Sequence, residues 1–221
     1  MNPAKVTYTI RPVAPDELAG PLLDQALWVF AGALGFPRDH GRVTSFADTI
    51  RRHAQLGGFR AFGALNSKRR LVGFSYGYSS QPGLWWREQI AQPLSPQQRA
   101  YWLADAFELA ELHVHPSAQG NRLGSQLHDL LLDGQPHRTA LLSVMHRSER
   151  ARQLYARRGW QTGGANATEP DQADPADGLA LDLERAERAG QSGRDHAGVQ
   201  PVVDQDPALE HGAHPGRRHG S

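Results

Sequence analysis

The first part of the chain changes between strand-like and helix-like spacing of its hydrophobic residues. In residues 6–12 apolar and polar positions alternate up to a proline, which predicts a half-buried strand. In residues 16–34 apolar positions recur every three or four residues and Gly35 follows them, which predicts a helix that ends there. A second helix is expected after Thr44 or Ser45, since either side chain can cap a first helical turn.

The middle of the chain continues these patterns and predicts a sheet. Two strands joined by a short polar turn indicate a hairpin, and two later strands are each followed by an amphipathic helix. The segment between them is rich in proline and tryptophan and is expected to be an insertion or a lid. These patterns together predict an α/β (α+β) fold in which helices flank a mixed, largely antiparallel sheet. The expected elements are strands 59–65, 71–78, 107–114 and 140–145, helices 119–133 and 148–158, and the insertion 79–105.

The composition changes after Thr162. Residues 163–221 contain no aromatic residue and no isoleucine, and only seven leucines and valines. Such a segment cannot supply a hydrophobic core, so we expect a folded domain over residues 1–162 and a disordered tail over residues 163–221. Within the tail, residues 178–183 alternate as a strand does, and we expect an edge strand there at most.

Composition and charge narrow the classes of function. The chain has no cysteine, which excludes disulfides, thiolate nucleophiles and cysteine-bound metals. Residues 163–221 hold 11 acidic and 5 basic residues although the whole chain carries a formal charge of +1, so the preceding part is basic. A basic domain suits a small polyanionic ligand, whereas the scattered arginines disfavour nucleic acid. Without a leader-like N-terminus or a long apolar run, we expect no membrane partner and a cytoplasmic location.

The most informative stretch is residues 111–132, where a predicted strand passes through a short glycine-containing loop into a helix. The first turn of a helix presents unpaired backbone N–H groups and the positive end of the helix dipole, which together bind phosphate. Gly120 and Gly124 remove side chains that would hold a phosphate away from the backbone. The same kind of turn is also a common structural connector, so the pattern alone leaves both interpretations open.

The residues of this loop resemble the pyrophosphate-binding signature of the GNAT superfamily of acetyl-CoA-dependent N-acetyltransferases. Residues 148–160 are similar to that family's helix ending in Leu-Tyr, three residues and Gly-Phe, and the two motifs occur in the family's order. Arg122 departs from the signature, because a glycine is usual at its position. The resemblance covers roughly residues 5–162, and it implies acetyl-CoA as cosubstrate with the pyrophosphate bound by Gln119, Gly120, Asn121, Arg122, Leu123, Gly124 and Ser125.

The resemblance also implies the remaining parts of the reaction. The pantetheine arm is expected to pair with the strand at Leu112, His113 and Val114, and Tyr155 is the expected general acid at the sulfur of CoA. Two residues are candidates for the base that deprotonates the amine: Glu108 and Glu111, which we expect on opposite faces of the strand. For each glutamate a solvated surface charge or an arginine partner is the alternative, and for Tyr155 the alternative is packing.

Other side chains permit further hypotheses. His113 and His115 share a strand face, but no third ligand at a suitable spacing accompanies them, so we expect no metal. Four aromatic residues of the insertion are candidates for the acceptor pocket, with ordinary packing as the alternative: Trp85, Trp86, Tyr101 and Trp102.

The expected function is the transfer of an acetyl group to a primary amine of a small molecule or a protein, by direct attack in a ternary complex. The alternative is a module that binds CoA or acyl-CoA without turnover, or a degenerate acetyltransferase. A homodimer remains open.

Overall fold

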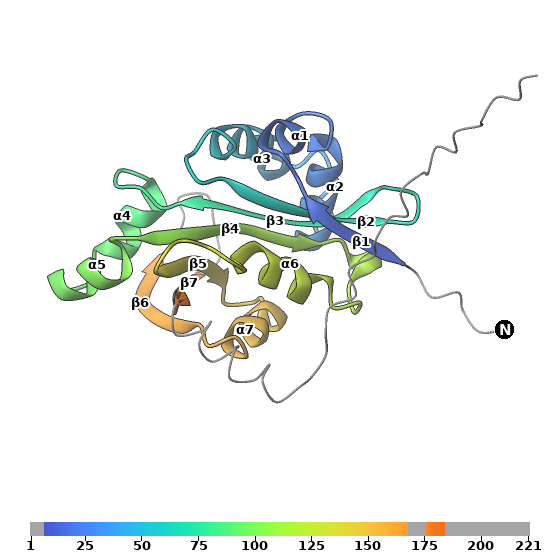
Figure 1. Ribbon diagram of the computed structural model, residues 1–221. Coiled ribbons are helices and arrows are strands. Elements are labelled where there is room, and N and C mark those ends of the chain that lie inside the picture. Colours follow the sequence, from blue (N-terminus) through green and yellow to red (C-terminus); the bar gives the residue numbers. More distant parts are fainter. Residues whose placement is uncertain (1–6, 168–175, 184–221) are drawn as a thin grey trace, which may run out of the picture.

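The computed structural model describes residues 7–167 and 176–183. These residues build one seven-stranded sheet with the order β1-β2-β3-β4-β5-β7-β6 (Figure 1). β4 and β5 run parallel and the other neighbouring pairs run antiparallel, which confirms the predicted mixed, largely antiparallel sheet. The strands are β1 (Tyr8–Pro12), β2 (Arg60–Asn66), β3 (Leu71–Ser79), β4 (Ala106–Val114), β5 (Thr139–Met145), β6 (Gln161–Ala167) and β7 (Ala176–Asp182).

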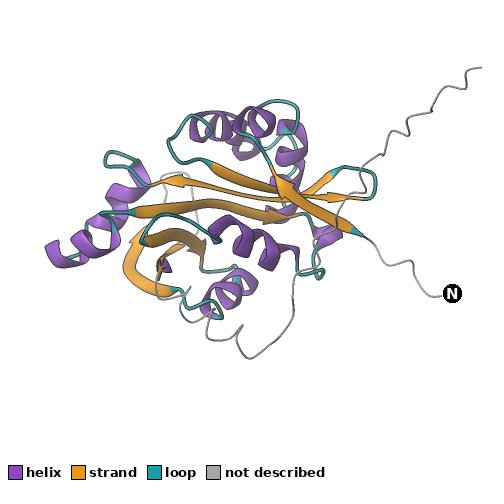
Figure 2. Cartoon of the chain, in the orientation of Figure 1, coloured by secondary structure: helices purple, strands orange, loops and turns teal. Residues whose placement is uncertain are grey.

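Helices cover both faces of the sheet (Figures 1 and 2). One face packs against α1 (Pro15–Ala19), α2 (Leu23–Leu34) and α3 (Gly41–His53). The other face packs against α6 (Leu123–Leu132) and α7 (Glu149–Ala156). The sheet therefore separates two hydrophobic cores, one under each group of helices.

The first predicted helix is divided in two. α1 ends at Ala19 and α2 begins at Leu23, so the break falls at Gly20 and Pro21. Proline has no N–H to donate to the preceding turn, and this is the physical reason that one continuous helix does not form. The predicted end of α2 is confirmed, because Gly35 adopts a left-handed conformation with φ of 75°.

The second helix begins earlier than predicted. α3 starts at Gly41 because the side chain of His40 accepts a hydrogen bond from the N–H of Arg42 at 3.2 Å. Thr44 and Ser45, the predicted caps, lie inside the helix and donate to the carbonyls of Gly41 and Arg42. Histidine is not a usual capping residue, so residue preferences do not indicate a helix start at His40.

The predicted insertion is helical through much of its length. It contains α4 (Trp85–Ala91) and α5 (Pro96–Trp102), and both lie at one end of the sheet (Figure 1). α5 begins with a capping box formed by Ser95 and Gln98. Trp86 of α4 packs against Ala106 and Leu141, so the insertion is anchored on the ends of β4 and β5.

The sheet continues beyond the boundary predicted at Thr162. β6 and β7 both belong to it, and β7 lies between β5 and β6 and not at an edge. β7 pairs with β5 along its whole length, from Ala176 opposite Met145 to Asp182 opposite Thr139. The strand expected at an edge is thus an inner strand, because it pairs with β5 on one side and with β6 on the other. The disorder predicted for residues 163–221 is thus wrong where β6 and β7 form, and residues 168–175 and 184–221 lie outside the described residues.

Candidate functional site

β4 and β5 diverge after a short parallel contact. Their pairing covers only Ala106 to Glu108 on β4, opposite Thr139 to Leu141 on β5. β4 nevertheless continues to Val114, so along its second half the side towards β5 has no strand partner in the described part of the chain. Such a strand leaves backbone N–H and C=O groups available to a ligand that binds as an added strand.

A β-bulge in β4 decides where its two glutamates point. Glu108 lies opposite Tyr78 and Glu111 lies opposite Tyr76, with a register shift between Tyr76 and Gly77. Tyr76 and Tyr78 are two residues apart and share a face of β3, so their partners share that face too. The expectation that Glu108 and Glu111 lie on opposite faces is therefore wrong. Both face α2 and α3.

The two glutamates differ in their surroundings. Glu108 is 5% exposed, and its carboxylate accepts hydrogen bonds from the hydroxyl groups of Tyr78, at 2.7 Å, and Ser80, at 3.5 Å. The Glu111 carboxylate lies 2.5 Å from Nε2 of His113, and its side chain is 22% exposed. Glu108 is thus held inside the sheet by neutral donors, whereas Glu111 is open to the cavity.

His113 has a side-chain role that the sequence did not indicate. Its ring packs against those of Phe30, Phe46 and Phe74, which lie on α2, α3 and β3. The same ring holds Glu111, so three apolar neighbours fix the position of the carboxylate's partner.

His115 has different neighbours from His113. It stacks on Trp28 with a centroid distance of 3.6 Å, and its Nδ1 lies 2.8 Å from the hydroxyl of Ser117. Within the described residues, no group of three or more His, Asp or Glu side chains is arranged to hold a metal ion.

The glycine-containing loop has two residues with positive φ. Gly120 has φ of 81° and Arg122 has φ of 60°, and α6 begins only at Leu123 instead of at the predicted Gln119. A Cβ atom on Gly120 would meet nothing within 4 Å, so backbone conformation and not space favours glycine there. Arg122 stands in the left-handed region at the cap of α6, which a glycine would adopt at lower cost.

Side chains fasten this loop to the strand before it. Nε2 of Gln119 donates to the carbonyl of Val114 at 3.0 Å, and Arg150 of α7 donates to Oε1 of Gln119 at 3.4 Å. Nδ2 of Asn121 donates to the carbonyl of Ala118 at 3.0 Å. The loop thus holds a fixed shape between β4 and the start of α6, as a backbone site for an anion requires.

Tyr155 is buried on α7 beside an aromatic and polar cluster. Its ring lies at 5.7 Å from that of Trp160 and at 5.9 Å from that of His128. Burial, with the negative charge of Glu111 as a second cause, raises the pKa of the Tyr155 phenol well above its ordinary value. The phenol therefore carries its proton at neutral pH.

The neighbouring cluster fixes the end of α7 on α6. The indole N–H of Trp160 donates to Nε2 of His128 at 3.0 Å, which leaves the His128 proton on Nδ1, 2.8 Å from Asp129. Arg158 makes two bonds to the Asp129 carboxylate, at 2.6 and 2.8 Å. Burial favours a higher pKa for Asp129, but the hydrogen bonds from Arg158 and His128 outweigh it and the pKa is lowered.

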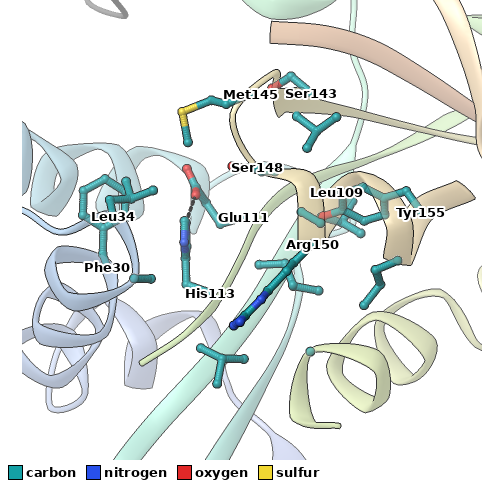
Figure 3. A pocket seen from close by; sticks show the side chains of 18 of the residues that line it. Phe30, Leu34, Leu109, Glu111, His113, Ser143, Met145, Ser148, Arg150 and Tyr155 are labelled. Carbon is teal, nitrogen blue, oxygen red and sulfur yellow. Dashed lines mark hydrogen bonds and ion pairs between the residues drawn. The ribbon is translucent and has the colours of Figure 1, made fainter. Parts of the chain in front are cut away.

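One cavity of about 1260 Å³ connects these features. It includes residues of α2 and α3 on one face of the sheet, the open half of β4, the loop before α6, and α7 on the other face. Figure 3 shows the Glu111–His113 pair, with Phe30 and Leu34 of α2 on one side and Tyr155 on the other. Every proposed site residue except Asn121 lines the cavity: Glu108, Glu111, Leu112, His113, Val114, Gln119, Gly120, Arg122, Leu123, Gly124, Ser125 and Tyr155.

The aromatic residues of the insertion divide into two groups. Trp85 and Trp86 line the cavity. Tyr101 and Trp102 are not among its lining residues, and their rings pack against each other at 4.8 Å. The tryptophans of α4 therefore remain candidates for the acceptor pocket, whereas the two aromatic residues of α5 do not reach this cavity.

The strand, glycine-containing loop and helix that the sequence predicted thus lie beside the open half of β4. No family model matches the chain. A GCN5-like protein acetyltransferase from Mycobacterium tuberculosis is 31% identical over 167 residues, which cover 62% of this chain and 80% of that protein. The chain belongs to the GNAT superfamily of acetyltransferases.

Solved structures show the same fold at low sequence identity. An acetyltransferase from Thermus thermophilus aligns over 80% of this chain and 97% of its own, with 16% identity and a TM-score of 0.52. The spermidine/spermine N-acetyltransferase of Vibrio cholerae, solved with manganese, aligns over 82% and 96%, with 12% identity and a TM-score of 0.53. In the described part of the chain, no helix is both long and apolar enough to cross a membrane.

Proposed function

We propose that this N-acetyltransferase moves the acetyl group of acetyl-CoA to a primary amine by direct attack in a ternary complex. The observation that carries the proposal is the single cavity, which joins the loop before α6 to the carboxylate of Glu111. An amine beside Glu111 can attack a thioester that extends from the loop, so the reaction needs no covalent intermediate on the protein. We also propose a cytoplasmic location, with which the cysteine-free composition is compatible.

The residues at the α6 end fit acetyl-CoA. The loop and first turn of α6 offer N–H groups for the pyrophosphate. A Cβ on Gly124 would lie 3.9 Å from the side chains of Leu112, Val114 and Leu154, which is ordinary van der Waals contact, so glycine keeps the backbone of this turn uncovered. Arg122 lies on the cavity wall and adds positive charge. The unpaired half of β4 at Leu112 to Val114 offers backbone groups to an extended arm.

Acetyl-CoA supplies an acyl group activated as a thioester. In the overall reaction the amine nitrogen gains the acetyl group and loses a proton, and the released sulfur gains one. Both glutamates line the cavity, but Glu111 is the better candidate to accept the amine proton, because its side chain is 22% exposed, whereas Glu108 is 5% exposed and accepts hydrogen bonds from Tyr78 and Ser80. Tyr155 retains its proton at neutral pH and can donate it from Oη on the α7 side.

Release of free thiol from acetyl-CoA, measured with a panel of amines, tests the proposal. We expect turnover with some amines and a loss of about 100-fold or more in kcat for Glu111→Gln, which is the usual contribution of a positioned base. Glu108→Gln should mainly lower stability, since it alters a buried hydrogen-bonded group. Binding of CoA without turnover on any amine would instead favour a non-catalytic CoA-binding module.

A further inference from the structure

The wall of the cavity formed by α3 carries unused positive charge. Arg42, Ser45, Thr49 and Arg52 all line the cavity. Their spacings of three, four and three residues place them in one stripe along the helix. The stripe faces the cavity with two guanidinium groups and two hydroxyl groups.

The arginines of this stripe are not neutralised by a neighbouring acid. NH2 of Arg52 donates to the hydroxyl of Thr49 at 3.2 Å, and the guanidinium of Arg42 lies 5.3 Å from the ring centroid of Phe36. In the described residues neither guanidinium has a carboxylate partner. Arg51 differs, because it forms an ion pair with Asp48 at 2.9 Å and does not line the cavity. Arg42 and Arg52 are thus available to an anion inside the cavity.

These charges are on the wrong side of the sheet to bind the pyrophosphate. α3 packs on one face, whereas the loop at residues 119–125 leads into α6, which packs on the other. The α6 side has its own arginines at the cavity wall, among them Arg122 and Arg150. The positive charge on α3 therefore faces the part of the cavity left for the acceptor.

Arg52 and the carboxylate of Glu111 both affect the pKa of His53, in opposite directions. Burial lowers the pKa of the His53 imidazole, Glu111 opposes that shift, and Arg52 adds to it. His53 itself lines the cavity, and its Nδ1 lies 3.2 Å from the hydroxyl of Tyr76, the residue opposite Glu111 in the sheet. Glu111, Arg52 and His53 all line the cavity, so a carboxylate and a guanidinium are both present on its α3 side.

We propose that the preferred acceptor is a primary amine that carries an anionic group, such as a carboxylate, in the same molecule. The amine lies at Glu111 and the anion at the stripe of α3, with Arg52 as its main partner. This inference rests on the proposed acetyl transfer, since it names the substrate class of that cavity. A diamine places a second ammonium beside Arg52, and like charges repel there.

The same chemistry occurs in free amino acids and in amines next to acidic residues of a protein. Both present an ammonium group and a carboxylate on one flexible chain. The side chain of Arg52 suits either source, because a guanidinium binds a carboxylate through two parallel hydrogen bonds.

Three amines with the same carbon chain test the proposal: 4-aminobutanoate, butylamine and 1,4-diaminobutane. We would titrate each into the CoA-free protein by calorimetry and then measure kcat/KM for each by thiol release. We expect 4-aminobutanoate to bind roughly 10-fold more tightly than the other two, which is the discrimination a charge-assisted hydrogen bond provides. Arg52→Gln should abolish this preference, and Arg51→Gln is the matched control that should preserve it.

Two peptides identify the source of the anion. They contain one lysine each, flanked by aspartates or by asparagines, and the aspartate peptide should surpass 4-aminobutanoate if the natural acceptor is a protein. If the diamine binds as tightly as 4-aminobutanoate, or if Arg52→Gln weakens all three amines equally, the proposal is overturned. Arg52-dependent binding of 4-aminobutanoate with no thiol release would refute the acetyl transfer while leaving the anion site in place.

Discussion

Replacing Leu181 by alanine tests whether β7 is part of the folded domain. Leu181 is 6% exposed, and it belongs to the core that includes Trp160, Tyr155 and the buried leucines of α6. A Cβ atom built on Gly159 would lie 3.9 Å from Cδ1 of Leu181, so this side chain fills the space beside Gly159. The substitution leaves the strand in place and removes only the part of the side chain that fills this core.

The size of the expected effect follows from burial. Truncating a buried leucine to alanine costs about 2–5 kcal/mol, because transfer energy is lost and a cavity remains. A domain of this size loses about 2–4 °C in Tm per kcal/mol, so Leu181→Ala should lower Tm by about 4–20 °C. Leu130 on α6 is 36% exposed, and Leu130→Ala should change Tm by about 2 °C or less.

Thermal unfolding followed by circular dichroism measures both variants under the same conditions. Two truncations extend the test: a chain ending after Leu183 should melt like the full chain, whereas one ending after Thr162 should not fold, since β5 then loses β7. Equal Tm values for Leu181→Ala and Leu130→Ala would refute the inner position of β7. Normal melting of the chain that ends after Thr162 would restore the earlier domain boundary.

Three further predictions concern the site and its support. Acetyl-CoA should raise Tm in the wild type and in Gly41→Glu but not in Gly124→Glu, where the added carboxylate lies at the start of α6 beside Leu112, Val114 and Leu154 and repels the pyrophosphate; equal stabilisation of both variants would contradict the site. Tyr155→Phe should lower kcat at least 10-fold with little change in the Kd of CoA, and an unchanged rate in a chemistry-limited assay would remove the phenol from the reaction. The third concerns pH: burial lowers the pKa of His128 in the fold, so between pH 6.5 and that lowered pKa the unfolded chain binds more protons, and Tm should fall as pH drops below about 6.5. A Tm that rises from pH 7.5 to pH 5.5 would contradict this assignment.

The strands and the glycine-containing loop were predictable because their signals are local. Alternation over residues 71–78 and the glycines of residues 119–125 each fit within a few positions of the sequence. Tyr155 was found through the matched helix and not through periodicity, and the structure places it on the cavity wall.

The features that the sequence did not reveal depend on distant partners. No residue type marks the bulge in β4, since the extra position is occupied by an ordinary alanine, Ala110, and the register with β3 alone defines it. β6 has the sequence QTGGANA, which has no hydrophobic alternation, and it becomes a strand because β7 lies beside it. The bond from Trp160 to His128 joins residues 32 positions apart.

One overlooked signal was present in the sequence. Helical spacing relates four polar residues of α3: Arg42, Ser45, Thr49 and Arg52. A helix that starts at Thr44 or Ser45, as predicted, leaves Arg42 outside this polar face. A helix start placed at His40 would have revealed a polar face next to the apolar one.

The divergence of β4 and β5 also bears on the order in which reactants come and go. The cavity extends past β4 from the α3 side of the sheet to the α6 and α7 side. With the acceptor on the first side and acetyl-CoA on the second, as proposed above, we expect each to enter without crossing the other. Neither reactant then has to leave before the other can be exchanged. We expect random addition, with intersecting lines in double-reciprocal plots, and an acetylated product that departs while CoA is still bound. A bulky macromolecular acceptor resting on α3 would leave the nucleotide side free to reload.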